Sequence, residues 1–196
     1  MSKGNDSQVS TPSLDTIEAE LGRERHKRNY LKALRSTLFS LLIVAAAAVL
    51  VTMLVLPVLQ ITGSSMTETL HDKDIVVALR GSGYKTGDVV AFYYNNNILV
   101  KRVMATEGQW VDIMEDGTVY VDNVRLDEPY ITDKALGECN ISLPYQVPDG
   151  KIFVMGDHRS TSVDSRSTAL GCVSADMVVG RLLVRVWPLN ALGPVS

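Results

Sequence analysis

The feature that most limits the possible folds of this 196-residue chain is a long stretch without charge. No charged residue occurs from Ser36 to Thr67, and within this stretch Thr37–Leu59 is apolar except for two threonines and one serine. About 20 apolar residues cross the hydrocarbon core of a membrane as a helix. A buried core helix needs a larger protein around it, and the apolar region of a cleavable signal peptide is shorter, about 7–15 residues. We therefore predict a transmembrane helix at 36–59.

The charges on either side of this span predict its orientation. Residues 1–35 carry seven Lys or Arg against five Asp or Glu, whereas the rest of the chain carries twelve against seventeen. Basic residues gather on the cytoplasmic side of membrane helices. We expect 1–35 to be a basic cytoplasmic tail whose polar first 20 residues have no ordered fold. Residues 60–196 are then the extracytoplasmic domain of a single-pass cell-membrane protein.

Composition excludes two other classes of protein. A net charge of −3 argues against a nucleic-acid binder, which usually has a basic face. Three His and two Cys are too few for a Cys/His zinc framework. We therefore expect neither a metal nor another cofactor, no nucleic-acid partner, and contact with the lipid bilayer through the apolar span.

After residue 60 the pattern changes from helix to strand. Short runs rich in Val, Ile and Tyr recur between turn residues. Asp116-Gly117 lies between two of these runs and favours a hairpin, because Gly accepts the positive φ of a tight turn. We predict a mostly antiparallel β domain, a sheet or barrel-like, on one N-terminal transmembrane helix. The predicted strands are Ile75–Leu79, Val89–Tyr94, Ile98–Met104, Trp110–Met114, Val119–Val121, Ile152–Met155 and Met177–Trp187.

Three segments of this domain contain residues that could carry out catalysis. Ser65 follows the anchor in a Gly/Ser-rich loop, Lys101 lies within an apolar strand, and 156–166 is a loop of alternating charges. Desolvation among apolar neighbours lowers the pKa of a lysine. A neutral lysine amine can accept the proton of a serine hydroxyl, as in Ser–Lys dyads.

The residues alone leave other functions open. His71 or His158 could serve a Ser–His–Asp triad, because triads are defined by geometry and not by sequence order. Cys139 or Cys172, with His158 and an arginine, could form a sortase-like site, although neither Cys has the threonine-rich context of that family. An anchored scaffold without enzymatic activity is the third possibility.

Taken together, these segments resemble the type I signal peptidases, the membrane-anchored serine proteases that remove signal peptides from secreted preproteins. The similar segments follow the family's order behind a single anchor, so that the resemblance covers residues 36–189. They are Gly63–Leu70 for the nucleophile box, Thr86–Phe92 for the Gly-Asp strand, Val100–Val103 for the box with the base, and Gly156–Arg166 for the Gly-Asp-x-Arg box.

The resemblance implies a role for each matching residue. Ser65 would be the nucleophile, Lys101 the general base, and Ser162 the hydroxyl that orients the lysine amine. An ion pair would brace the loop, and two further residues would support the site. These bracing and supporting residues are Asp164 and Arg166, and Arg102 and Asp157.

The resemblance also implies the substrates, which are secretory preproteins cut after small, Ala-like residues. Some members use a Ser two residues before the nucleophile to bind the oxyanion, but Gly63 stands there, so the oxyanion hole needs other donors. A related possibility is a Ser–Lys protease that cleaves itself or a dedicated substrate and not preproteins in general. Shallow apolar pockets would be lined by Ile61, Met66, Leu70 and Val100.

Cys139 and Cys172 both belong to the predicted extracytoplasmic domain, where disulfides can form. We expect the two cysteines to pair. The closed loop would span 33 residues and stabilise the domain by roughly 3–4 kcal/mol. Two unpaired thiols, one of them packed in the core, are the alternative.

Overall fold

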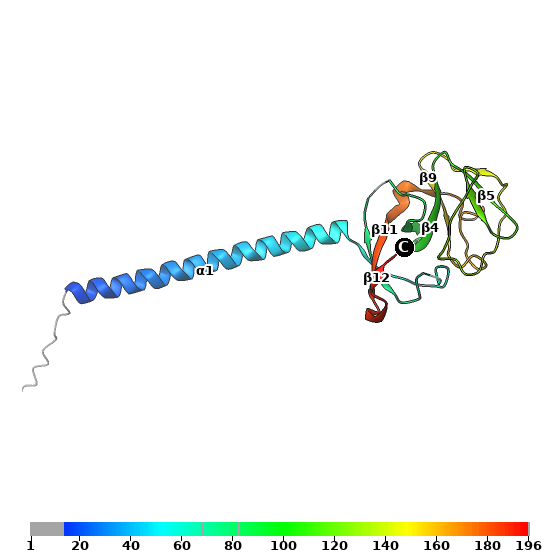
Figure 1. Cartoon of the computed structure of the whole chain (residues 1–196). Coiled ribbons are helices and arrows are strands. Elements are labelled where there is room, and N and C mark those ends of the chain that lie inside the picture. Colours follow the sequence, from blue (N-terminus) through cyan, green and yellow to red (C-terminus); the bar gives the residue numbers. More distant parts are fainter. Residues whose placement is uncertain (1–13, 68, 82, 196) are drawn as a thin grey trace, which may run out of the picture. The chain divides into compact units, whose positions relative to one another are not determined.

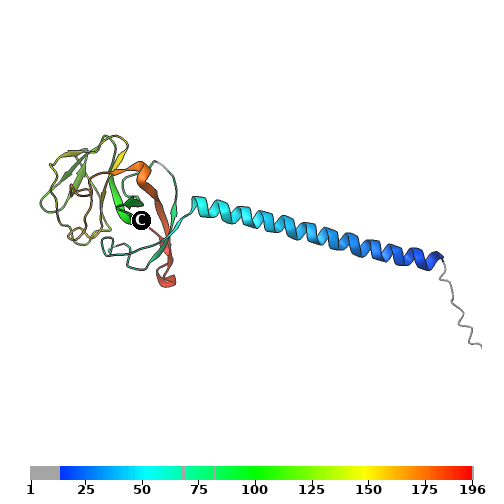
Figure 2. The same ribbon diagram turned by 180° about the vertical axis from the view of Figure 1, so that it is seen from behind.

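The computed structural model describes residues 14–67, 69–81 and 83–195. It divides into two units, one up to Val51 and one from Thr52 onward. The described residues of the first unit all belong to helix α1 (Leu14–Val55), which both views show as one unbroken helix (Figures 1 and 2).

Helix α1 contains most of the predicted membrane span, up to Val55. The segment from Gly22 to Val55 is long and apolar enough to cross a membrane, and none of its most apolar window is buried within the protein. Leu41, Val44 and Leu54, for example, are 64–68% exposed. A helix with apolar side chains exposed all round is unfavourable in water, and lipid would cover it.

Both ends of α1 differ from the expected bounds. The helix ends at Val55 and not at Leu59, because Pro57 has no N–H for a helical hydrogen bond and Val58–Gln60 pairs as a strand. At the other end, residues 14–20 are helical although we expected no ordered fold there. Extending an existing helix costs less than nucleating one, and this stretch lacks Gly and Pro. Residues 1–13 lie outside the described residues.

The second unit is built on two antiparallel sheets. The larger sheet contains β1 (Val58–Gln60), β2 (Ile75–Leu79), β3 (Val89–Tyr94), β4 (Asn97–Thr106), β9 (Lys151–Met155), β10 (Val173–Ser174), β11 (Val178–Trp187) and β12 (Gly193–Pro194). Its order is β1-β2-β11-β3-β4-β9-β10, with β12 beside β11. In the described part of the chain β1 and β10 do not pair with each other, so the sheet is open and not a closed barrel. The prediction of a mostly antiparallel β domain after one N-terminal apolar helix is confirmed.

The smaller sheet lies beside the larger one (Figures 1 and 2). Its order is β7-β6-β5-β8. The predicted hairpin joins β5 to β6, with Gly117 in its turn at a φ of +81°. Two short 3₁₀ helices, η1 (Ala175–Met177) and η2 (Leu189–Ala191), flank β11. The strands of the smaller sheet are β5 (Trp110–Ile113), β6 (Val119–Val121), β7 (Val124–Arg125) and β8 (Tyr145–Gln146).

Strand β4 lies within the larger sheet, between β3 and β9, and its alternation sorts the side chains that matter for the site. Lys101 and Val103 point to one face, where Val103 packs with Phe92 in a buried cluster. Arg102 points to the opposite face. Lys101 and Arg102 are 3% and 1% exposed, so one strand carries two adjacent cations into the interior from opposite sides.

Candidate active site

The loop that carries Ser65 connects β1 to β2 and is fixed at several points. Gly63 has a φ of +94°, which favours glycine, and its N–H donates to Asp72 Oδ1 over 3.1 Å. The side chain of Met66 is buried in the core. The N–H of His158 donates to the Ser65 carbonyl over 3.0 Å. The Ser65 loop is therefore fixed by one hydrogen bond within the β1–β2 connection and by another from the segment that follows β9.

Lys101 is buried and bonded to a serine. Its Nζ donates to Ser162 Oγ over 2.9 Å, which is the contact that the resemblance implies. Burial lowers the pKa of Lys101 to about 8, because desolvation and the nearby Arg166 outweigh the attraction of Asp164 and Asp157 for its charge. At pH 7 about a tenth of the amine is then neutral, far more than for an exposed lysine, whose pKa is about 10.4.

Two neighbouring cavities meet at Ser65. One, of about 380 Å³, is lined by Ser65 and Lys101 together, with Thr161 and Val163 at its side. The other, of about 520 Å³, also includes Ser65 and continues between β1 and β4. An extended polypeptide could therefore lie across the Ser65 hydroxyl.

The predicted pocket residues lie in and under the larger cavity. Ile61, Met66 and Val100 line it. Leu70 does not line it, but is buried in the same apolar cluster as Ile61 and Met66. The floor of the cavity is therefore apolar and tightly packed.

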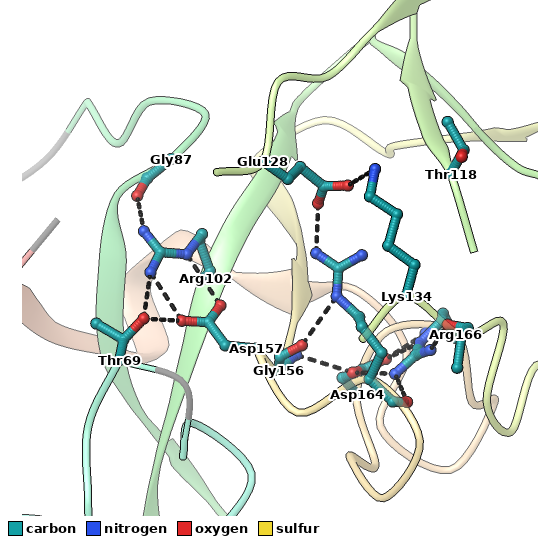
Figure 3. Close-up of polar contacts among 12 residues, drawn as sticks. Thr69, Gly87, Arg102, Thr118, Glu128, Lys134, Gly156, Asp157, Asp164 and Arg166 are labelled. Atoms are coloured by element: carbon teal, nitrogen blue, oxygen red, sulfur yellow. Dashed lines mark hydrogen bonds and ion pairs between the residues drawn. The ribbon is translucent and has the colours of Figure 1, made fainter. Parts of the chain in front are cut away.

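The loop 156–166 is rigidified by a buried ion pair. Arg166 Nε and Nη2 donate to the two oxygens of Asp164 over 2.8 Å each, and the Gly156 N–H donates to Asp164 Oδ2 over 2.9 Å (Figure 3). Burial alone would raise the pKa of Asp164, but the hydrogen bonds and charge of Arg166 hold it below its ordinary value. Asp164 therefore stays charged and keeps the loop closed.

A second buried pair joins Arg102 to Asp157. Arg102 Nε and Nη2 donate to the two Asp157 oxygens over 2.9 and 2.7 Å, and Arg102 Nη1 donates to the Gly87 carbonyl over 2.9 Å (Figure 3). The Thr69 hydroxyl donates to Asp157 Oδ2 over 2.5 Å. This cluster connects the Ser65 loop, the turn before β3 and the 156–166 loop. The bidentate pair of Arg102 and Asp157 fixes the geometry of the cluster.

The structure contains two site neighbours that the sequence did not indicate. Glu128 forms a buried ion pair with Arg159, and the ring of Tyr130 lies 3.7 Å from the Arg102 guanidinium carbon. Glu128 and Tyr130 come from an irregular segment far from the resembling boxes. In the sequence, the one sign of a further acidic partner was Arg159. The acids near it in sequence, Asp157 and Asp164, form their ion pairs with other arginines.

Neither histidine candidate lines the cavity that Ser65 shares with Lys101, within the described parts of the chain. His71 lines a separate cavity beside Arg185. The His158 ring contacts the Thr161 hydroxyl, 2.8 Å from Nδ1. In residues 14–67, 69–81 and 83–195, no group of His, Cys, Asp or Glu converges as a metal site requires.

The expected disulfide is wrong, because both cysteines are free thiols. Cys172 interacts with the Tyr145 hydroxyl, and burial raises the pKa of its thiol. Next to Cys139, the N–H of Asn140 donates to the Arg166 carbonyl over 3.0 Å. Cys172 thus has a side-chain partner, and Cys139 adjoins a residue that is bonded to Arg166.

Three comparisons show which known proteins this chain is similar to. The family described as "Signal peptidase, peptidase S26" matches residues 34–187. Signal peptidase I T of Bacillus subtilis (strain 168) is 34% identical over 145 residues, 67% of this chain and 74% of the relative. Signal peptidase IB of Staphylococcus aureus (strain Mu50 / ATCC 700699) is 37% identical over 151 residues, 66% of this chain and 77% of the relative. A crystal structure of a signal peptidase I from Enterococcus faecalis V583 aligns over 97% of its chain and 51% of this one, with 29% identity and a TM-score of 0.42.

Proposed function

This chain belongs to the signal peptidase family, peptidase S26, and on that premise we propose that it cleaves signal peptides from secreted preproteins after small residues, with a Ser65–Lys101 dyad. The observation that carries the proposal is the shared cavity. In it, the buried Lys101 amine, with its lowered pKa, lies with the Ser65 side chain. A neutral amine beside a serine hydroxyl can activate that hydroxyl, and the shared cavity supports this role for the two residues.

In the proposed mechanism, Ser65 Oγ attacks the scissile carbonyl while neutral Lys101 takes the hydroxyl proton. The resulting ammonium gives this proton to the leaving amine, which departs as the new N-terminus and leaves an ester on Ser65. Lys101 then takes a proton from water, whose oxygen attacks the ester. The released Ser65 oxygen recovers the proton from Lys101, so the enzyme returns to its starting state.

Ser162, in this mechanism, keeps the Lys101 amine in place. Its Oγ accepts one of the Nζ protons over 2.9 Å, and this contact restricts the rotation of the amine. Gly63 offers no side chain to the oxyanion, so the proposed donor is the backbone N–H of Ser65, together with other donors near it.

The preference for small residues is proposed from the packing beneath the larger cavity. Ile61, Met66 and Leu70 are 4%, 3% and 1% exposed and belong to one buried cluster. A substrate methyl group can lie against such a floor, whereas a large side chain would have to displace close-packed atoms.

Cleavage of a preprotein by the purified full-length protein tests this function. We expect a model preprotein with Ala at the third and first positions before the cut to give a single mature product, whose new N-terminus is identified by sequencing. Ser65→Ala is the matched inactive control. Equal product from wild type and Ser65→Ala would contradict the proposal.

The orientation of the anchor is a separate proposal. We expect residues 1–35 in the cytoplasm and 60–196 outside, because basic residues cluster just before the uncharged span. Protease added to intact spheroplasts should then remove the β domain and spare the tail. Such tethering would raise the local concentration of enzyme where preproteins emerge. Protection of the β domain would refute this orientation.

A further inference from the structure

Residues 128–137, which we call the strap, run between β7 and β8 without regular secondary structure. The strap contacts three arginines that belong to the active-site segments, Arg102, Arg159 and Arg166. Each of the three is at most 1% exposed. Buried guanidinium groups need partners, and the strap supplies some of them.

The first contact is the ion pair between Glu128 Oε1 and Arg159 Nη2, whose side chains are both fully buried. Arg159 Nε also donates to the Gly156 carbonyl over 3.1 Å. Lys134, from the strap itself, lies 3.5 Å from Glu128 Oε2 (Figure 3). Arg159 Nη1 is buried without a hydrogen bond in the described structure. Glu128 is therefore the carboxylate partner of Arg159.

The second contact is the ring of Tyr130 over Arg102, with 3.7 Å between the guanidinium carbon and the ring centroid. A cation over an aromatic face is attracted by the electron density of the ring. Arg102 is the residue next to Lys101 in β4, and it binds Asp157 on the 156–166 loop. Tyr130 therefore closes the Arg102–Asp157 cluster from the side of the strap.

The third contact is made by the backbone of the strap. Arg166 Nη1 donates to the Leu136 carbonyl over 2.5 Å and to the Ala135 carbonyl over 3.3 Å. A Cβ on Gly137 would lie 2.8 Å from Arg166 Nη1. On its other side, a Cβ on Gly117 would lie 2.5 Å from the Ala135 nitrogen. The strap is thus closely packed between the β5–β6 hairpin and the 156–166 loop.

We propose that Glu128 and Tyr130 are positioning residues for the reaction, through which the strap keeps Lys101 and Ser162 in their reactive arrangement. The inference rests on the proposed function. Its basis is the convergence of the contacts: Arg102 adjoins Lys101 in sequence, and Arg166 Nη2 lies 3.5 Å from the Ser162 carbonyl. Neither Glu128 nor Tyr130 lines the cavities at Ser65, so both act through other residues.

The charges that act on the Lys101 amine distinguish positioning from a direct electrostatic effect. They are Asp164, Arg166 and Asp157. Removing the negative charge of Glu128 could by itself only lower the pKa of Lys101, so a rise in that pKa after substitution of Glu128 would report movement of the loop.

The test compares Glu128→Gln with Glu138→Gln in the full-length protein, using cleavage of a preprotein in detergent. Glu138 is exposed and lies beside the strap, so its variant makes the same chemical change without touching Arg159. For Glu128→Gln we expect kcat to fall about 10- to 100-fold, since small misplacements of reacting groups have effects of this size, with little change in KM. We also expect the acid limb of its pH profile to move to higher pH, because water reaching Lys101 raises its pKa toward the ordinary value.

Tyr130 provides a second pair of variants that does not depend on Glu128. Tyr130→Phe keeps a ring over Arg102 and should keep wild-type activity. Tyr130→Leu removes the ring and should lower kcat and shift the acid limb in the same direction as Glu128→Gln. Circular dichroism and thermal unfolding of each variant measure the folded fraction, by which kcat is corrected.

Two outcomes overturn the proposal. If wild type cleaves the preprotein, and Glu128→Gln and Tyr130→Leu match Glu138→Gln in corrected kcat and pH profile, the strap only stabilises the fold and its positioning role is wrong. If wild type does not cleave the preprotein at all, the proposed function fails, and the role of the strap in it fails as well.

Discussion

Lys101→Met should abolish cleavage of a preprotein, lowering kcat by about 10⁴-fold or more, while the domain stays folded. Met has a similar length and suits the apolar surroundings of Leu99 and Val103, so the buried strand should tolerate it. What is lost is the amine that would take the Ser65 proton. Initial rates with the preprotein, measured beside circular dichroism spectra, check both halves of this expectation.

Matched variants separate the dyad from its alternatives. Lys101→Arg should be as inactive as Lys101→Met, because a guanidinium does not deprotonate near neutral pH. Combining Lys101→Met with Ser65→Ala should be no worse than either alone, since residues acting as one unit are not additive. His71→Ala and His158→Ala should keep substantial activity. An active Lys101→Met beside an inactive His158→Ala would show that a histidine is the base.

The same assignment fixes the sign of the pH dependence. The neutral amine is the reactive form. The value of kcat/KM for the preprotein should therefore fall as the pH drops below about 8, the pKa of Lys101 in the free enzyme.

Gly156→Ala should have the second large effect, a loss of activity of about 100-fold or more. A Cβ at this position would lie 2.2 Å from Ser162 Oγ and 2.7 Å from the Ser65 carbonyl oxygen. Both distances are far below van der Waals contact, so one or both serines must move, and displacements of this order have large effects on rate. Gly81→Ala, whose Cβ would meet nothing within 4 Å, is the control. Wild-type kinetics in Gly156→Ala would show that the close approach is not needed.

The sequence predicted the strands that carry an apolar pattern between turns. The bounds of β2, β3 and β6 are those expected, and Asp116-Gly117 forms the expected hairpin. β1 was missed because Val58 and Leu59 continue the apolar sequence of the predicted membrane span beyond Pro57. β7, β8, β10 and β12 have two residues each, too few to show any periodicity.

In the candidate site, the contacts that could be predicted join residues of the segments that resemble the family, and the contacts that could not involve residues outside those segments. The structure brings Lys101 to Ser162 and pairs Asp164 with Arg166, as the resemblance implied. Glu128 could not be predicted as the partner of Arg159, because the two meet through tertiary packing across 31 positions of sequence. The disulfide failed for a related reason: the count and compartment of cysteines carry no information on where their side chains point.

The buried pair of Glu128 and Arg159 has a consequence for how this domain can diverge. Losing one member leaves an uncompensated charge in the interior, whereas replacing both by apolar residues of similar volume can be tolerated. Selection therefore acts on the two positions jointly, and single-step drift at either one is blocked. Among relatives, positions equivalent to 128 and 159 should change together or not at all, a pattern of covariation that contact in space produces.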